Sequence, residues 1–272
     1  MPSYVITGVS KGLGFEFLRQ ISSDPNNKVV GIVRDKLGTE KRVAEELSGR
    51  SNITILQADM TVYDQLKKAA EDAAPILGGK LDYLIANAGY VSMFDAFHGI
   101  GTLGTQTPTE LQQDLQKCME TNVYANIHLY NLFMPLILKG EVKKVVVISS
   151  GLGNTELTAE YDLDVGALYA ISKAAMNMAT AKFSAQYRKD GVLFLSLCPG
   201  MVDVGRYDNV TPEQAAGLGR LLQVFKEYAP HFEKPAQPEE AIRDVVKVWE
   251  SSSIENGNGG AFLSHNGNKQ WL

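Results

Sequence analysis

The size, composition and charge of the chain restrict what the protein can be. It has 272 residues, 44% hydrophobic and 21% charged, so it can bury a large core and is not intrinsically disordered. The net charge is −5 and lysines and arginines do not cluster, which disfavours nucleic acid or an anionic membrane as partners. Cys118 and Cys198 are expected to be buried free thiols, and no metal site is predicted. We expect a cytoplasmic protein with a small-molecule substrate.

A glycine-rich turn follows the first predicted strand. The apolar run from Tyr4 to Ile6 leads into Gly8, Gly12 and Gly14, and a helical pattern begins directly afterwards. The free N–H groups and the dipole at a helix N-terminus attract an anion, and glycine lets the backbone approach a pyrophosphate closely. The turn is therefore a candidate dinucleotide site, although a glycine pattern alone also fits an ordinary tight turn.

The same residues match the nucleophile elbow of hydrolases. Gly8-Val9-Ser10-Lys11-Gly12 has the G-x-S-x-G pattern, whose serine attacks an acyl group. That elbow lies after several strands and an oxyanion loop, whereas only one predicted strand precedes Ser10. The hydrolase interpretation is therefore excluded.

The next strand, residues 28–33, ends at a position that distinguishes NADP from NAD. Arg34 lies 20 residues after Gly14, where an acid selects NAD and an arginine accommodates the 2′-phosphate of NADP. Lys11 adds a second positive charge. Asp35 is the opposing candidate, and both residues could instead form a solvated turn. Because Arg34 and Lys11 are both positively charged and only Asp35 is acidic, the sequence favours NADP(H) over NAD.

The rest of the chain alternates strands and helices. Strands are predicted at 52–57, 81–85, 144–148, 192–197 and 260–263, and helices at 39–47, 62–74, 109–138, from 169 onward and at 238–250. This alternation predicts a single doubly wound α/β domain of the Rossmann type over residues 1–272, with a parallel sheet and helices on both faces. The stretches 90–107, 151–165 and 201–235 are predicted to be irregular.

Several strands end in residues suited to a ligand site. Asp59 follows one strand, where it could bind a ligand or cap the next helix. Another strand ends in Ala86-Asn87-Ala88-Gly89, whose small side chains would let a cofactor lie against the backbone. Asn122 falls within a predicted helix, where an asparagine is usually exposed or locally hydrogen-bonded.

Tyr169 and Lys173 are spaced to lie on one face of a helix. An ammonium group near a phenol lowers its pKa, which makes tyrosine a usable acid or base. Ser150, at the end of the strand 144–148, could donate a hydrogen bond to a substrate oxygen. The Tyr-x-x-x-Lys pattern alone is frequent by chance, but it gains weight after this strand and the glycine turn.

Together these motifs resemble the short-chain dehydrogenase/reductase family over nearly the whole chain, in family order. The most similar members are the carbonyl-reductase-like proteins of the sniffer and C-factor type, which include fungal ketoreductases acting on polyketides. The resemblance implies a seven-stranded sheet of order 3-2-1-4-5-6-7 and a homodimer or homotetramer formed through helices around 110–138 and 169–188.

The resemblance also implies the roles of single residues. Asn122 would hold a proton-relay water, Ser150 would orient the carbonyl, Tyr169 would act as acid/base and Lys173 would bind the nicotinamide ribose. The residues expected to bind NADP(H) are Gly8, Ser10, Lys11, Gly12, Leu13, Gly14, Arg34, Asp59, Met60, Asn87, Ala88, Gly89, Tyr169, Lys173, Pro199, Gly200 and Val202.

The sequence departs from the family pattern at four places. Ala86 replaces an asparagine before Asn87, and Val204 replaces a threonine that would bind the nicotinamide carboxamide. Ser150 and Tyr169 are 19 residues apart, several more than in many members, and the segment 90–108 looks enlarged.

We therefore expect an NADPH-dependent reductase of ketones or aldehydes, and the rival is a non-catalytic NADPH-binding regulatory or assembly protein of the same fold. A lid at about 201–235 should close over a bulky, largely apolar or aromatic ketone, although Arg206 and Arg220 could bind an acidic group. The apolar residues expected around the substrate are Tyr90, Met93, Phe94, Phe97, Leu152, Leu157, Tyr161, Met201, Tyr207, Leu221, Leu222, Phe225 and Tyr228.

Overall fold

A seven-stranded sheet, parallel throughout, forms the centre of the computed structural model, which describes residues 1–208 and 210–272 without the side chain of residue 213. Its order is β3-β2-β1-β4-β5-β6-β7, so the parallel sheet and the strand order expected from the sequence are confirmed. The strands are β1 (Ser3–Thr7), β2 (Lys28–Val33), β3 (Ile53–Gln57), β4 (Tyr83–Ala86), β5 (Lys144–Ile148), β6 (Leu193–Cys198) and β7 (Ala261–Ser264).

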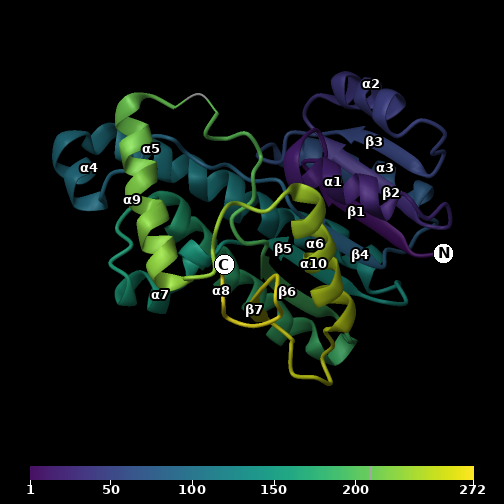
Figure 1. Cartoon of the computed structure of the whole chain (residues 1–272). Coiled ribbons are helices and arrows are strands. Elements are labelled where there is room, and N and C mark those ends of the chain that lie inside the picture. The colour runs from purple at the N-terminus through teal and green to yellow at the C-terminus, as the bar shows by residue number, and fades with distance from the viewer. Residues whose placement is uncertain (209) are drawn as a thin grey trace.

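Helices connect the strands and cover both faces of the sheet (Figure 1). They are α1 (Gly12–Ile21), α2 (Lys36–Glu46), α3 (Tyr63–Ile76), α4 (Ile100–Gln106), α5 (Pro108–Met119), α6 (Ala125–Ile137), α7 (Thr155–Glu160), α8 (Ala167–Tyr187), α9 (Pro212–Tyr228) and α10 (Pro238–Ser251). Shorter turns of helix lie at Glu120–Tyr124, Gly151–Gly153 and Arg188–Asp190.

Successive residues of each strand point to opposite faces of the sheet, and each face has its own core. In β5, Val145 and Val147 pack with α3, α6 and α8, whereas Val146 packs with α1 and α10. Because both faces are covered, the strands are apolar along their whole length, which explains runs such as Lys28–Val33 (KVVGIV).

The predicted helix 109–138 exists, but it contains a π-helical turn. It runs as α5, the turn Glu120–Tyr124 and α6. The turn contains Asn122, which is 1% exposed and not on the surface. A π-turn within an α-helix frequently marks a functional site, because it redirects one side chain without ending the helix.

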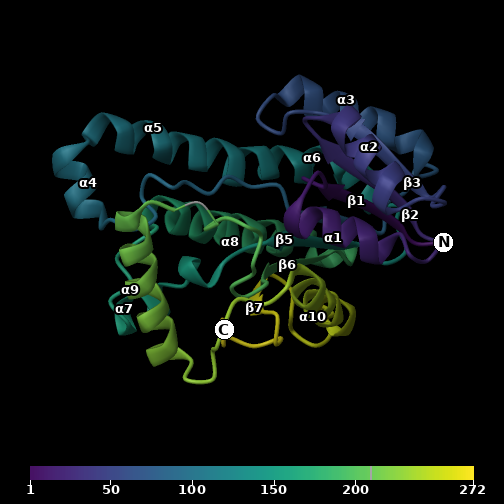
Figure 2. The ribbon, with the colours of Figure 1, turned by 45° about the horizontal axis from the view of Figure 1, so that its top comes forward.

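The three stretches predicted to be irregular each contain a helix. These are α4 within 90–107, α7 within 151–165 and α9 within 201–235. The last has a sequence signal that identifies it, since Thr211 and Gln214 form a capping box around Pro212 at the first helical position. Glycines at 101 and 104 obscure α4, because glycine is a poor helix former. Figures 1 and 2 place these helices at the end of the molecule away from the N-terminus.

The cysteines, the apolar helices and the possible metal ligands bear on further expectations from the sequence. Cys118 and Cys198 are buried free thiols, as predicted. Within residues 1–208 and 210–272, no helix combines the length and apolar character needed to cross a bilayer. Over the same ranges, His, Cys, Asp and Glu side chains form no group of three or more that could hold a metal ion.

Candidate functional site

The glycine turn after β1 has the conformation that the sequence indicated. Gly8 and Gly12 have φ angles of +75° and +56°, and residues other than glycine rarely adopt such a backbone conformation. At Gly14 a Cβ would lie 2.0 Å from the carbonyl oxygen of Gly8 and 2.5 Å from Nδ2 of Asn87. No residue with a Cβ fits at position 14, because the backbone of Gly8 lies so close to the first turn of α1.

The N-terminus of α1 is available to an anion. Lys11 is the N-cap residue, and in the described part of the chain no side chain accepts a hydrogen bond from the first turn of this helix. Ser10 and Lys11 are exposed beside it, and Leu13 packs against the core below. Uncapped N–H groups at a glycine turn are the arrangement that binds a pyrophosphate, so these residues fit a dinucleotide.

Asn87 holds this turn from the neighbouring strand β4. Its Nδ2 donates to the carbonyl oxygen of Thr7 at 2.9 Å, and Oγ1 of Thr7 accepts from the backbone N–H groups of Asn87 and Ala88 at 3.1 and 3.0 Å. The retained asparagine therefore joins the ends of β1 and β4, although Ala86 replaces the residue before it.

Arg34 and Asp35 have separate environments at the end of β2. Asp35 is the N-cap of α2, and its Oδ1 accepts from the backbone N–H of Gly38 at 2.9 Å. Arg34 is exposed, and its positive charge helps to lower the pKa of Asp59. Burial alone would raise that pKa, but the two hydrogen bonds that Asp59 accepts from Thr61 and the charge of Arg34 outweigh it.

Arg42 is a second cation near the glycine turn, and sequence reasoning missed it. Its Nη1 donates to the carbonyl oxygen of Ser10 at 3.1 Å, and its guanidinium lies 3.9 Å from the ring centroid of Phe15. The residue lies within α2, where no sequence pattern distinguishes it from the other charged residues of that helix.

Asn122 links three segments of the site through its side-chain amide. Its Oδ1 accepts from the backbone N–H of Tyr90 at 2.7 Å, and its Nδ2 donates to the carbonyl oxygen of Tyr90 at 2.8 Å and to Oγ of Ser172 at 2.9 Å. Its carbonyl oxygen accepts from Nδ2 of Asn126 at 2.9 Å. Both N–H groups of the side-chain amide are used, whereas Oδ1 and the main-chain carbonyl oxygen each accept one of these bonds and have a second lone pair for a water.

Gly89 lies directly above this network. A Cβ at Gly89 would lie 3.2 Å from Oδ1 of Asn122 and 3.7 Å from Nζ of Lys173. The small residues that end β4 therefore border the helix that carries Tyr169 and Lys173. Met60, by contrast, is buried in the core beneath the end of β3.

Lys173 points back toward the end of β5. Its Nζ donates to the carbonyl oxygen of Ile148 at 2.7 Å and lies 5.4 Å from the ring centroid of Tyr169. Burial lowers the pKa of Lys173 to about 8, because an ammonium group loses hydration inside the protein. The lysine is thus able to gain or lose a proton near neutral pH.

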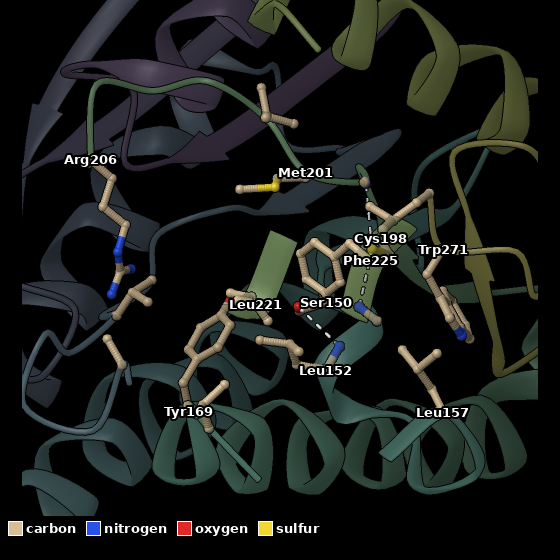
Figure 3. A pocket seen from close by; sticks show the side chains of 18 of the residues that line it. Ser150, Leu152, Leu157, Tyr169, Cys198, Met201, Arg206, Leu221, Phe225 and Trp271 are labelled. Carbon is tan, nitrogen blue, oxygen red and sulfur yellow. Dashed lines mark hydrogen bonds between the residues drawn. The ribbon is translucent and has the colours of Figure 1, made fainter. Parts of the chain in front are cut away.

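Tyr169 and Ser150 face a common cavity (Figure 3). Burial raises the pKa of the Tyr169 phenol and Cys198 adds to the rise, while Arg206 and Ser150 lower it. The net direction is opposite to the one predicted, since burial outweighs the nearby positive charge. Ser150 accepts the backbone N–H of Leu152 at 3.3 Å, which leaves its hydroxyl proton available.

The cavity has a volume of about 220 Å³ and largely apolar walls. Seven residues predicted to surround the substrate line it: Leu152, Leu157, Met201, Tyr207, Leu221, Phe225 and Tyr228. Tyr90, Met93, Phe94, Phe97, Tyr161 and Leu222 are not among the residues that line it.

Packing explains two of these exceptions. The hydroxyl of Tyr90 donates to Oδ1 of Asp114 at 2.8 Å, away from the cavity. Tyr161 packs edge-on against Tyr228, with ring centroids 5.2 Å apart.

Part of the cavity wall was not foreseen from the sequence. Cys198, Asp95, Trp271 and Leu272 line it as well, and the ring of Trp271 stacks on Phe262 with centroids 4.2 Å apart. The signal for Trp271 was its place after β7, since the carboxyl ends of all parallel strands meet at one edge of the sheet.

The segment after β6 begins with Pro199 and Gly200, and Gly200 has a φ of +80°. Val202 pairs with Ala236 in an isolated parallel bridge, and the backbone N–H of Ala236 donates to the carbonyl oxygen of Met201 at 2.9 Å. The two ends of the predicted lid 201–235 are therefore joined at its base. Within that lid, residue 209 and the side chain of residue 213 lie outside the described residues.

Comparisons with known proteins agree with this geometry. A family model described as short chain dehydrogenase matches residues 3–215. The chain belongs to the short-chain dehydrogenase family. It is 59% identical over 272 residues to the short chain dehydrogenase virK of Hypocrea virens, with all of both chains covered. Proteins of this family are oxidoreductases that use a nicotinamide cofactor.

Solved carbonyl reductases share the fold. The NADPH-bound carbonyl reductase from chicken fatty liver matches with a TM-score of 0.77 and 23% identity, and 98% of each chain is covered. The carbonyl reductase Sniffer of D. melanogaster matches with a TM-score of 0.74 and 21% identity, again over 98% of each chain. The expected likeness to carbonyl reductases of the sniffer type is therefore confirmed.

The lowered pKa of Lys173 predicts a pH-dependent stability. In the folded protein the group titrates at about 8 and in the unfolded chain at its ordinary value of 10.5. The unfolded state therefore binds more protons between these values, so the cost of burying the ammonium is fully present below pH 8 and fades as the pH rises. Relative to Lys173→Met, the wild-type free energy of unfolding should increase from pH 8 to pH 10 in urea titrations.

Lys182→Met is the matched control, because Lys182 is an exposed lysine of the same helix. Its stability difference from the wild type should not follow this pH course. If the difference in free energy of unfolding between the wild type and Lys173→Met stays constant from pH 8 to pH 10, the lowered pKa of Lys173 is contradicted.

Proposed function

We propose that this protein is an NADPH-dependent ketoreductase that converts a bulky, largely apolar or aromatic ketone into an alcohol. The observation that carries the proposal is the position of Tyr169. Its phenol faces an apolar cavity together with Ser150, and its helix also brings Lys173 beneath Gly89. The same residues would oxidise the alcohol in the reverse direction.

The proposed cofactor site extends along the carboxyl edge of the sheet. The turn from Gly8 to Gly14 would hold the pyrophosphate, and Asn87, Ala88 and Gly89 would lie against the nucleotide. Asp59 and Met60 would adjoin the adenosine end, while Pro199, Gly200 and Val202 would adjoin the nicotinamide. The uncapped N-terminus of α1 and the close approach at Gly14 support this placement.

When bound, NADPH supplies the hydride that reaches the carbonyl carbon, and NADP⁺ remains. Tyr169 donates its phenolic proton to the carbonyl oxygen, so that the C=O bond becomes a C–O–H group. Ser150 donates a hydrogen bond to the same oxygen, where negative charge develops. The raised pKa of Tyr169 keeps the phenol protonated at neutral pH, which is the form that a reduction requires.

The proton lost by Tyr169 must be replaced before the next turnover. Lys173, with its pKa lowered to about 8, is suited to pass a proton to the phenolate. A water on the main-chain carbonyl of Asn122 would connect this ammonium to solvent. The side chain of Asn122 would act differently, by holding Tyr90 and Ser172 in place.

Replacing Tyr169 by phenylalanine tests the catalytic role. Tyr169→Phe keeps the aromatic packing but has no proton to donate, so kcat should fall by at least ~10²–10⁴. The Kd for NADPH, measured by fluorescence titration, should change little. Tyr124→Phe is the control, because Tyr124 is 52% exposed on the long helix. A kcat near the wild-type value in Tyr169→Phe would refute the assignment.

Arg34 is proposed to select NADPH through the 2′-phosphate. The separation of roles at the end of β2 supports this, because Asp35 is engaged in capping α2 while Arg34 remains exposed. Lys11 and Arg42 are further cations at the glycine turn, and Arg42 is also ion-paired with Glu46 at 2.6 Å. The chicken carbonyl reductase of the same fold is bound to NADPH, which is consistent with this choice.

Removing the charge at Arg34 should weaken NADPH binding selectively. Loss of a charge-assisted contact costs roughly 1.5–3 kcal/mol, so Arg34→Ala should raise the Kd for NADPH about ten- to a hundredfold. The Kd for NADH should barely change, since NADH lacks the 2′-phosphate. If titration shows that the wild type binds NADH as tightly as NADPH, Asp35 selects the cofactor instead.

The cavity wall supports an apolar substrate under a mobile lid. Leu221, Phe225 and Tyr228 of α9 line the cavity and pack in one apolar cluster with Leu152 and Leu157. Its volume of about 220 Å³ is below the ~300–1,000 Å³ of sites for drug-sized ligands. A bulky ketone would therefore require the segment that carries α9 to move outward and close again.

Substrate size can be tested with two ketones of similar reactivity. A bicyclic aromatic ketone such as 1-tetralone should have a clearly higher kcat/KM than pyruvate, because only the aromatic ketone fills the apolar cavity. The measurement is NADPH consumption followed by absorbance. A preference for the small keto acid would overturn this description of the substrate.

A further inference from the structure

One cation lies in the wall of this largely apolar cavity. Arg206 follows β6 in the segment that begins the lid, and among the described residues that line the cavity it is the only lysine or arginine. Figure 3 shows its side chain descending along one side of the cavity from the loop above Tyr169. Burial raises the pKa of the Tyr169 phenol, and the charge of Arg206 opposes part of that rise.

The hydrogen bonding of Arg206 is incomplete. A guanidinium has five N–H donors. Nη2 of Arg206 donates to the carbonyl oxygen of Ser92, which attaches the loop after β4 to the segment after β6. Nε is buried and has no hydrogen-bond partner. In the described part of the chain, no carboxylate lies within ion-pair distance of this guanidinium.

Among the side chains of the described residues that line the cavity, only that of Asp95 carries a carboxyl group. Its Oδ2 accepts the backbone N–H of Leu168 at 2.7 Å, at the start of the helix that carries Tyr169. Burial raises the pKa of Asp95 above its ordinary value, although the backbone N–H of Leu168 opposes this rise. Asp95 thus holds the start of α8 through Oδ2, while its Oδ1 and the Nε of Arg206 are both buried without a hydrogen-bond partner.

We propose that Arg206 binds a carboxylate carried by the aromatic or apolar ketone, so that the enzyme selects acidic ketones of this class. The proposal rests on the proposed reductase function, which provides the ketone. The planar guanidinium matches the two oxygens of a carboxylate, and apolar surroundings strengthen such a pair. With the carbonyl at Tyr169, the carboxylate would lie on the side of the substrate that faces Ser92.

A matched pair of ketones separates charge from size. 4-Acetylbenzoate and its methyl ester share the same aromatic ketone, and only the first carries a charge. The ratio of kcat/KM for the acid to that for the ester should fall about ten- to a hundredfold in Arg206→Met, which removes the charge and keeps an apolar side chain. Arg220→Met is the control, since Arg220 is exposed on α9 and does not line the cavity. This variant should keep the wild-type ratio.

Other roles of Arg206 give different results. If the Kd for NADPH rises in Arg206→Met and the ratio stays constant, the arginine binds the cofactor and the proposal is wrong. If both ketones lose activity equally, Arg206 only joins the two loops, and the proposal is again wrong. An increase of the ratio would also refute it.

A binding measurement keeps this test independent of the reductase proposal. The protein has two tryptophans, Trp249 in the core and Trp271 in the cavity wall, so quenching of tryptophan fluorescence reports occupancy. If neither ketone is reduced, the proposed activity fails, but saturable quenching by 4-acetylbenzoate in the presence of NADP⁺ that is lost in Arg206→Met would still support a carboxylate site. Equal binding of the acid to the wild type and to Arg206→Met would exclude that site.

Discussion

The side-chain amide of Asn122 holds together the three segments from which the site is built. It joins the loop after β4 through Tyr90, the long helix through its own π-turn, and α8 through Ser172. A buried amide without partners would destabilise the fold, so these bonds must form together. They fix α8 relative to the sheet, and with it the distance from Tyr169 and Lys173 to the ends of β4 and β5. The π-turn makes this possible by turning the asparagine inward without interrupting the helix.

Burial sets the protonation of the site more strongly than the neighbouring charges do. It raises the pKa of Tyr169 and lowers that of Lys173, so two groups with similar ordinary pKa values differ clearly in proton affinity inside the protein. A proton would then pass favourably from the ammonium of Lys173 to a phenolate at Tyr169, but not in the opposite direction. The sequence spacing of tyrosine and lysine suggested a simpler picture in which the lysine charge dominates. Spacing alone cannot reveal how deeply a side chain lies, and depth decides the result here.

Much of the fold and of the site could be predicted because the signals are local. Strand patterning, the glycines at 8, 12 and 14 and the residues after each strand all act within a few positions of the chain, and the topology brings them to one edge. What was missed depends on contacts between distant segments. Arg42 meets the glycine turn only because α2 lies against α1, and Trp271 meets the cavity only after β7 has joined the sheet. The helices α4, α7 and α9 were missed for another reason, because their short or glycine-containing sequences give weak periodicity.

The bridge between Val202 and Ala236 makes the segment between them a loop with fixed ends. Changes in the length of such a loop cost only a small, logarithmic amount of closure entropy, and they leave the register of β6 and β7 unaffected. The backbone hydrogen bonds of the sheet do not pass through this loop, although Leu221 and Phe225 of α9 pack in one cluster with Cys198 at the end of β6. The half of the molecule that would hold the nucleotide and the half that would meet the substrate can therefore diverge at different rates. One scaffold is thereby able to serve many substrates while keeping a single way of handling the proton.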